Sequence, residues 1–121
     1  KFHKNLNPNY YSKAVEKILT ITDNSIENFN VLVFSDDLGL AKRALAYTNL
    51  DCHYIENKSN IEDFVHMSMC DHNVIGNSTF AWWAAYMNKN SGLVVGPKDF
   101  FGKNYSNFLL DDFYPIEWLI L

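Results

Sequence analysis

Small polar residues fall at two points of this 121-residue chain where a short apolar run ends and helical periodicity begins. One of these points is Asn77, Ser78 and Thr79, just before an apolar stretch that starts at Phe80. Residues of these types cap helices, and the free N–H groups of a first helical turn, at the positive end of the helix dipole, attract anions. The sequence therefore predicts a phosphate site here, with the N–H groups of Ser78, Thr79 and Phe80 as donors.

The second point is Ser35, Asp36 and Asp37, which follow the apolar run from Val31 to Phe34. In open parallel sheets, ligands bind outside the carboxyl ends of the strands. We therefore expect the two polar segments to line one edge of a sheet, where a nucleotide would lie. The alternative for both segments is local: Asp36 or Asp37, and Ser78 or Thr79, only cap the helices that follow.

Apolar spacing predicts helices that alternate with short strands. Helical periodicity covers residues 8–22, 38–47, 61–69 and a segment beginning near residue 79, while short apolar runs mark strands at 31–34, 52–55, 73–75 and 93–95. The run at 31–34 is typical of a strand buried on both faces. Such alternation implies right-handed crossovers and a Rossmann-like α/β fold, with a parallel sheet covered by helices on both faces. After Pro97 we expect aromatic loops and an apolar tail from Trp118 to Leu121.

Composition limits the class of protein. The length suits one domain, and 48% hydrophobic residues allow a sizeable core. The net charge of −4 and the absence of a basic run argue against a nucleic-acid partner held through its phosphates. No apolar run reaches the roughly 18 residues of a membrane span, and no signal peptide is visible, so the compartment stays open.

Cysteine and histidine residues suggest two further possibilities. Cys52 and Cys70 allow one disulfide, although both are better interpreted as small apolar core residues. His66, Cys70 and His72 are candidate metal ligands, but a closed zinc site needs four ligands and the sequence places no fourth. We therefore expect no metal.

Four motifs occur in the order typical of glycosyltransferase family 11, the α-1,2-fucosyltransferases. I-G-N-S-T-F-A-W-W-A-A-Y-M-N (Ile75 to Asn88) resembles the family's signature, and V-F-S-D-D (Val33 to Asp37) resembles its upstream acidic motif. Val94 to Gly102 and Tyr114 to Trp118 are similar to its downstream and C-terminal segments. The resemblance covers nearly the whole chain.

The resemblance implies an inverting transferase of the GT-B type, with two Rossmann-like domains, that moves fucose from GDP-fucose to the 2-OH of a galactose-terminated glycan in glycan biosynthesis. Residues 1–121 resemble the C-terminal, donor-binding domain, and we expect a fragment whose partner is the N-terminal acceptor domain of the same protein. Such enzymes need no divalent ion or other cofactor for the donor, so the Asp36-Asp37 pair is read as structural or donor-facing. They are cytoplasmic or membrane-associated, in the Golgi of eukaryotes.

One residue role also follows from the resemblance. Asp63 lies fifteen residues before Ser78, in the place of an aspartate that accepts hydrogen bonds from the guanine edge in related fucosyltransferases. The alternative is a solvated side chain in the first turns of a helix. Trp82 and Trp83 suggest a sugar-stacking platform, but neighbours on a helix point about 100° apart, and packing against two different elements is the better interpretation.

The family's basic motif, H-x-R-R-x-D, whose arginine neutralises the leaving diphosphate, is not found. His3 has no R-R-x-D after it, so we expect that this chain alone lacks part of the catalytic machinery, and no general base is assigned. Two alternatives stay open. One is a non-catalytic sugar-nucleotide-binding remnant. The other is a phospho-receiver domain, with Thr79 and Lys98 near its later Ser/Thr and Lys positions, but only Glu56 stands near the phosphorylated aspartate's position.

Overall fold

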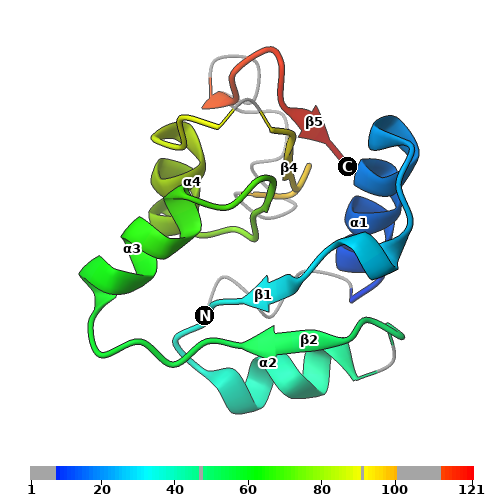
Figure 1. Ribbon diagram of the computed structural model, residues 1–121. Coiled ribbons are helices and arrows are strands. Elements are labelled where there is room, and N and C mark those ends of the chain that lie inside the picture. The colour runs from blue at the N-terminus through cyan, green and yellow to red at the C-terminus, as the bar shows by residue number, and fades with distance from the viewer. Residues whose placement is uncertain (1–7, 47, 91, 101–112) are drawn as a thin grey trace.

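The computed structural model describes residues 8–46, 48–90, 92–100 and 113–121. Within these ranges helices and strands alternate along the chain (Figure 1). The elements are α1 (Pro8–Thr22), the 3-10 helix η2 (Ile26–Asn28), β1 (Val31–Val33), α2 (Leu38–Leu45), β2 (Cys52–Tyr54), α3 (Asn60–Ser68), β3 (Asn73–Val74), α4 (Thr79–Tyr86), β4 (Val94–Gly96) and β5 (Leu119–Ile120). The four predicted helices and the first four strands are confirmed, each to within a residue or two, and β5 falls in the predicted apolar tail.

The described strands pair only in parallel, but they form two sheets rather than one. β1 pairs with β2, with Val31 opposite Cys52. β3, β4 and β5 form the second sheet in that order, with Asn73 opposite Val94 and Val95 opposite Leu119. The α/β class is confirmed. Full burial of β1 is not confirmed, because all three of its residues are only half-buried. Among the described strands, β1 pairs with β2 alone.

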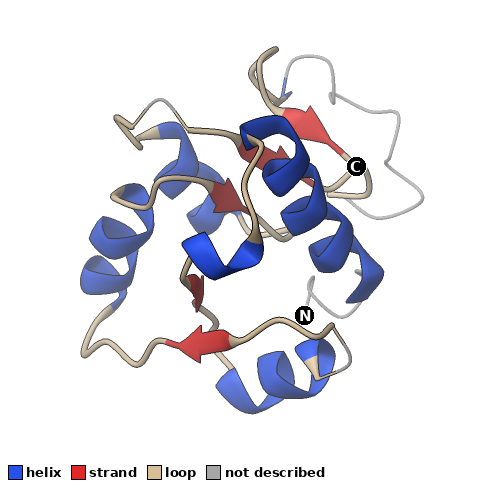
Figure 2. Ribbon diagram, turned by 45° about the vertical axis from the view of Figure 1, so that its right-hand side comes forward, coloured by secondary structure: helices blue, strands red, loops and turns tan. Residues whose placement is uncertain are grey.

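Helices cover both faces of the three-stranded sheet. Val95 packs with α1, in a core that also contains Tyr10, Ala14 and Ile18. Its neighbour Val94 packs into a second core, on the α4 side. Successive side chains of a strand point to opposite faces, so β4 contributes to both cores. Figure 1 shows β4 and β5 between α4 and α1, and Figure 2 shows the same helices from a second direction.

Tyr10 ties α1 to the sheet through its hydroxyl group. This side chain is 8% exposed, and its Oη donates to the carbonyl oxygen of Ile75 at 2.6 Å and contacts that of Val95 at 3.1 Å. Burial raises the pKa of the Tyr10 phenol well above its ordinary value. Because Ile75 directly precedes the turn at Gly76, the hydroxyl fixes the backbone from which the turn into α4 departs.

Tyr114 approaches β4 so closely that the strand needs a glycine. The Tyr114 hydroxyl donates to the carbonyl oxygen of Pro97 at 2.7 Å, and a Cβ added at Gly96 would lie 2.9 Å from Cε1 of the Tyr114 ring. Gly96 and Pro97 are both buried. The Gly-Pro pair that ends β4 therefore makes room for an aromatic side chain.

The two tryptophans of α4 have different surroundings. Trp82 stacks on Tyr86 with ring centroids 5.2 Å apart, and it also packs against Phe113 and Trp118. Trp83 is 52% exposed. The packing interpretation is therefore right for Trp82, whereas Trp83 lies half in solvent.

Trp83 belongs to an apolar outer surface formed by two helices, which we call the α3–α4 outer surface. The residues of this surface are Ile61, Val65 and Met69 of α3 with Phe80, Trp83 and Met87 in and just after α4, and each is at least 40% exposed. The helices contact each other along their lengths. Among the described helices, none has the length and apolar character that crossing a membrane requires.

Candidate functional site

The start of α4 has the capped geometry expected from the sequence. Ser78 has an extended backbone, and its Oγ accepts a hydrogen bond from the N–H of Ala81 at 3.2 Å. Asn77 is buried, at 5% exposure, while Thr79 and Phe80 are exposed on the first turn. The capping alternative thus describes what Ser78 does here. Phosphate binding by the first-turn N–H groups stays a prediction, since one serine can cap a helix whose N–H groups also face an anion.

The Ser35–Asp37 segment is a tight turn that starts α2. Asp37 accepts from the N–H of Leu40 at 2.9 Å, so it caps this helix. Ser35 Oγ accepts from the N–H of Asp37 and contacts its carbonyl oxygen, at 3.1 Å in both cases. Asp36 is exposed. Of the two aspartates, Asp37 therefore has a structural role as a cap, and a donor-facing role for Ser35, Asp36 and Asp37 stays a prediction.

Asp63 lies in the first turn of α3 and has a defined partner. Ser59 caps this helix by accepting from the N–H of Glu62, whose carboxylate accepts in turn from the N–H of Lys58 at 2.8 Å. The side chain of Asp63 is half-buried, and its Oδ1 accepts from Nδ2 of Asn57 at 2.9 Å. The Asp63 carboxylate thus has one hydrogen-bond partner, in a hydrogen bond that is exposed to solvent, and its contact with guanine stays a prediction.

Ring contacts show that α3 links the two predicted polar segments. Phe64 of α3 contacts Phe80 of α4 edge to face, with ring centroids 5.5 Å apart. His66 of α3 contacts Phe34, the residue before Ser35, with ring centroids 5.0 Å apart. The end of β1 and the start of α4 thus both lie against the helix that carries Asp63, although β1 and β3 belong to different sheets.

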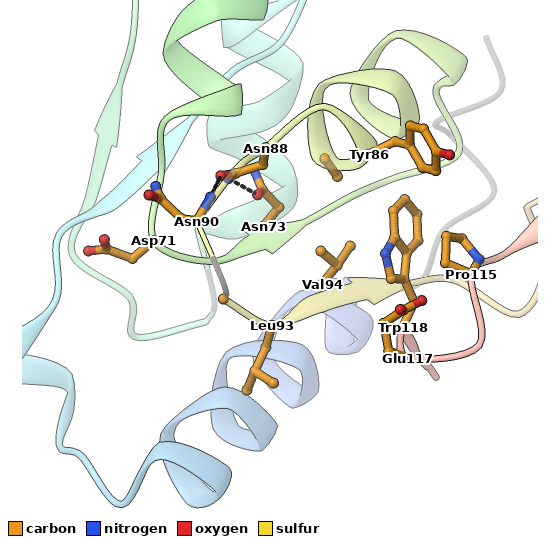
Figure 3. Close-up of a pocket in the computed structure, with 12 residues that line it drawn as sticks. Asp71, Asn73, Tyr86, Asn88, Asn90, Leu93, Val94, Pro115, Glu117 and Trp118 are labelled. Carbon is orange, nitrogen blue, oxygen red and sulfur yellow. Dashed lines mark hydrogen bonds between the residues drawn. The ribbon is translucent and has the colours of Figure 1, made fainter.

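A cavity of about 460 Å³ lies elsewhere, where β3, β4 and the segment before β5 begin and α4 ends (Figure 3). Its lining includes the carboxylates of Asp71 and Glu117, the rings of Tyr86 and Trp118, and a group of asparagines. None of the predicted donor-binding residues lines it, and those from Asn77 to Phe80 are at the opposite ends of β3 and α4. Sequence reasoning did not find this cavity.

The asparagines of this cavity bind the C-terminal end of α3, and we call them the asparagine cluster. Asn73 donates to the carbonyl oxygen of Met67 at 2.9 Å. Asn88 donates to Asn73 Oδ1 and to the carbonyl oxygen of Cys70, both at 2.7 Å. Asn90 Nδ2 lies 3.0 Å from the carbonyl oxygen of Met69. These amides donate to carbonyl groups at and just beyond the end of α3, where regular helical hydrogen bonding stops, which explains why polar residues gather at this wall. The only sequence signal was the abundance of asparagine between elements.

The candidate metal ligands His72 and Cys70 each contact a different backbone group. Nδ1 of His72 accepts from the N–H of Leu93 at 2.9 Å, and the Cys70 thiol lies 3.5 Å from the carbonyl oxygen of His66. In the part of the chain that the structure describes, no three His, Cys, Asp or Glu side chains gather as a metal site would require. Cys52 and Cys70 are free thiols, half-buried rather than deep in the core, and burial raises the pKa of both.

The parallel strands, the covering helices and the polar junctions at strand ends define a Rossmann-like α/β unit of the kind found in glycosyltransferases. The chain matches glycosyl transferase family 11 over residues 3–121, and it belongs to this family. This membership removes the phospho-receiver alternative. His3 lies outside the described residues.

Two curated relatives come from Escherichia coli. The O-antigen biosynthesis glycosyltransferase WbnK is 36% identical over 117 residues, which are 92% of this chain and 37% of the relative. An alpha-1,2-colitosyltransferase is 31% identical over 100 residues, which are 77% of this chain and 34% of the relative. The chain thus spans about a third of the length of these relatives. No solved structure matches it significantly.

Proposed function

We propose that this chain is the donor-binding part of a GT-B type α-1,2-fucosyltransferase, and that it holds GDP-fucose for inverting transfer to the 2-OH of a galactoside. The observation that supports the proposal is that α3, the helix that carries Asp63, contacts both Phe34 at the end of β1 and Phe80 at the start of α4, in a chain of family 11. Those are the two polar junctions at which the motifs predict donor contacts.

Two parts of the donor would meet two different kinds of group. The Asp63 carboxylate would accept from the ring N–H and the amino group of guanine, a pair of donors that adenine does not offer. The diphosphate would lie at the N–H groups of Ser78, Thr79 and Phe80, where the helix dipole favours negative charge. Asn77, Ser35, Asp36 and Asp37 complete the proposed contacts, and no metal is required.

The proposed transfer step requires a general base for the acceptor and stabilisation of the leaving diphosphate. The acceptor hydroxyl attacks C1 of fucose from the face opposite GDP, the bond from C1 to the phosphate oxygen breaks, and a general base takes the hydroxyl proton. Negative charge grows on the departing diphosphate, and N–H groups already aimed at it stabilise the transition state. We assign no residue of this chain as the base.

Calorimetry with GDP and ADP tests the donor site. We expect a clear preference for GDP, which Asp63→Ala abolishes; unchanged selectivity in that variant would refute the guanine assignment. Bulkier residues in place of Gly76, Asn77 and Ser78 should weaken GDP more than guanosine, because only GDP has phosphates to contact the turn. Equal losses for both ligands would show that the turn does not contact phosphate.

A transfer assay separates the remaining candidates. Labelled fucose from GDP-fucose should appear on lactose when the chain is part of its full-length protein. A relative named as a colitosyltransferase makes colitose the second candidate sugar, so the GDP-linked forms of both sugars are compared. Donor binding without transfer of either sugar by the full-length protein would support the non-catalytic remnant instead.

A further inference from the structure

The hydrogen bond between Asn57 and Asp63 shows which way the side-chain amide of Asn57 is turned. Asn57 lies in the loop between β2 and α3, six residues before its partner. Its Nδ2 is 2.9 Å from Asp63 Oδ1 and 3.5 Å from Nδ1 of His66. A carboxylate only accepts, so the NH₂ group and not the amide oxygen must face Asp63.

His66 is a second neighbour of the Asn57 amide nitrogen. The imidazole of His66 lies one turn further along α3, and Phe34 packs against it edge to face. The amide nitrogen of Asn57 has two hydrogens. One is donated to Asp63, and the second has His66 Nδ1 as its acceptor in the tautomer in which that nitrogen carries no proton. The end of β1 therefore contacts the residue that helps to hold the Asn57 amide.

We propose that Asn57 is a positioning residue that fixes the plane of the Asp63 carboxylate, and thereby sets the preference for guanine over other purines. This inference rests on the proposed function, in which Asp63 accepts from the guanine edge. Asn57 does not touch the base in this proposal; it acts through the carboxylate.

A carboxylate can accept from Asn57 and from a bound base at the same time. Its two oxygens offer about four acceptor positions. One position on Oδ1 is used by Asn57, so a second on Oδ1 and those on Oδ2 remain for a ligand. Guanine presents two parallel donors, which require the carboxylate and the base to lie nearly in one plane. Hypoxanthine presents only the ring N–H and tolerates a rotated carboxylate.

The experiment measures GDP, IDP and ADP binding by calorimetry for the wild type, Asn57→Ala, Asn57→Asp and Asn60→Ala. Asn60→Ala is the matched control, because it removes an exposed asparagine from the first turn of the same helix. We expect Asn57→Ala to lose about five- to tenfold in GDP affinity, the worth of one ordinary hydrogen bond at an exposed position, with a smaller loss for IDP and none for ADP. Asn57→Asp puts a second carboxylate beside Asp63 and should lower the GDP-to-IDP ratio further. The control should match the wild type.

Each result decides the question. A lowered GDP-to-IDP ratio in both Asn57 variants, with thermal unfolding unchanged, supports the positioning role. Equal losses for all three nucleotides would reveal a general structural role and overturn it. If Asp63→Ala abolishes the preference for GDP while Asn57→Ala leaves it intact, only this inference fails. If the wild type itself does not prefer GDP, the proposed function fails and the inference falls with it.

Discussion

Replacing Tyr10 with phenylalanine tests whether one hydroxyl group fixes the turn that leads into α4. The ring stays and its packing in the α1 core is kept, so the change removes only the hydrogen bond to the carbonyl oxygen of Ile75 and the contact with that of Val95. Val95 keeps the hydrogen bond from the N–H of Ile75 at 2.9 Å. Ile75 loses a buried 2.6 Å bond from the hydroxyl.

The loss of this hydrogen bond determines how far Tyr10→Phe lowers the free energy of unfolding. A buried acceptor left without its donor costs about 1–3 kcal/mol. A loss of about 2 kcal/mol, with a slope of about 2 kcal/mol per M of urea, lowers the unfolding midpoint by about 1 M. Urea unfolding followed by circular dichroism at pH 8 measures this shift. An unchanged midpoint would refute the inference that the hydroxyl holds the carbonyl group of Ile75.

The pH dependence gives an independent check. Burial raises the pKa of Tyr10 in the folded chain, while the unfolded chain releases this proton near the ordinary value of about 10. Above that pH the unfolded state binds fewer protons than the folded state, so stability falls by about 1.4 kcal/mol per pH unit for this group. Tyr10→Phe lacks this loss. A penalty of about 2 kcal/mol at pH 8 should therefore shrink to about 0.6 kcal/mol at pH 11. A constant penalty across this range would mean that Tyr10 ionises alike in both states.

The other predictions concern glycines, a cap and the asparagine cluster. Gly96→Ala should cost about 1–3 kcal/mol, because its Cβ would meet the Tyr114 ring at 2.9 Å. Gly39→Ala, whose Cβ meets nothing closer than 3.4 Å, should be neutral or stabilise α2 by about 0.5–1 kcal/mol, and thermal unfolding compares the two. Ser78→Ala should cost about 1 kcal/mol through the lost cap, a loss that Ser78→Asp restores in urea unfolding. Asn88→Ala removes two 2.7 Å bonds and should raise hydrogen exchange at the end of α3 before that of β4; a uniform rise would contradict a local role.

The sequence predicted the elements well because their signals are local. Apolar spacing marks α1 and α3, and the residue types at positions 37, 59 and 78 are those that cap helices in the structure. β5 was missed because its two residues are a strand only through backbone pairing with β4. The separation into two sheets has the same origin, since spacing along one strand carries no information about its neighbour.

The candidate site was predictable in its parts but not in its connections. Residue types and the family motifs indicated Ser78 and Asp63. The contact of Asn57 with Asp63 depends on how the loop before α3 turns, and no spacing rule encodes that path. The asparagine cluster joins the end of α3 to segments that lie as far as 21 residues away, and it too arises only when the chain is folded.

The α3–α4 outer surface has a practical consequence for samples of this protein. Met69 is 70% exposed and Met87 is 54% exposed, and both line a small hollow of about 290 Å³. Peroxide converts an exposed thioether into a polar, chiral sulfoxide. In an aged preparation, oxidation of Met69 and Met87 will therefore make this part of the surface more polar, while the core stays unchanged. Batches should be compared by intact mass before their solubility or surface binding is compared.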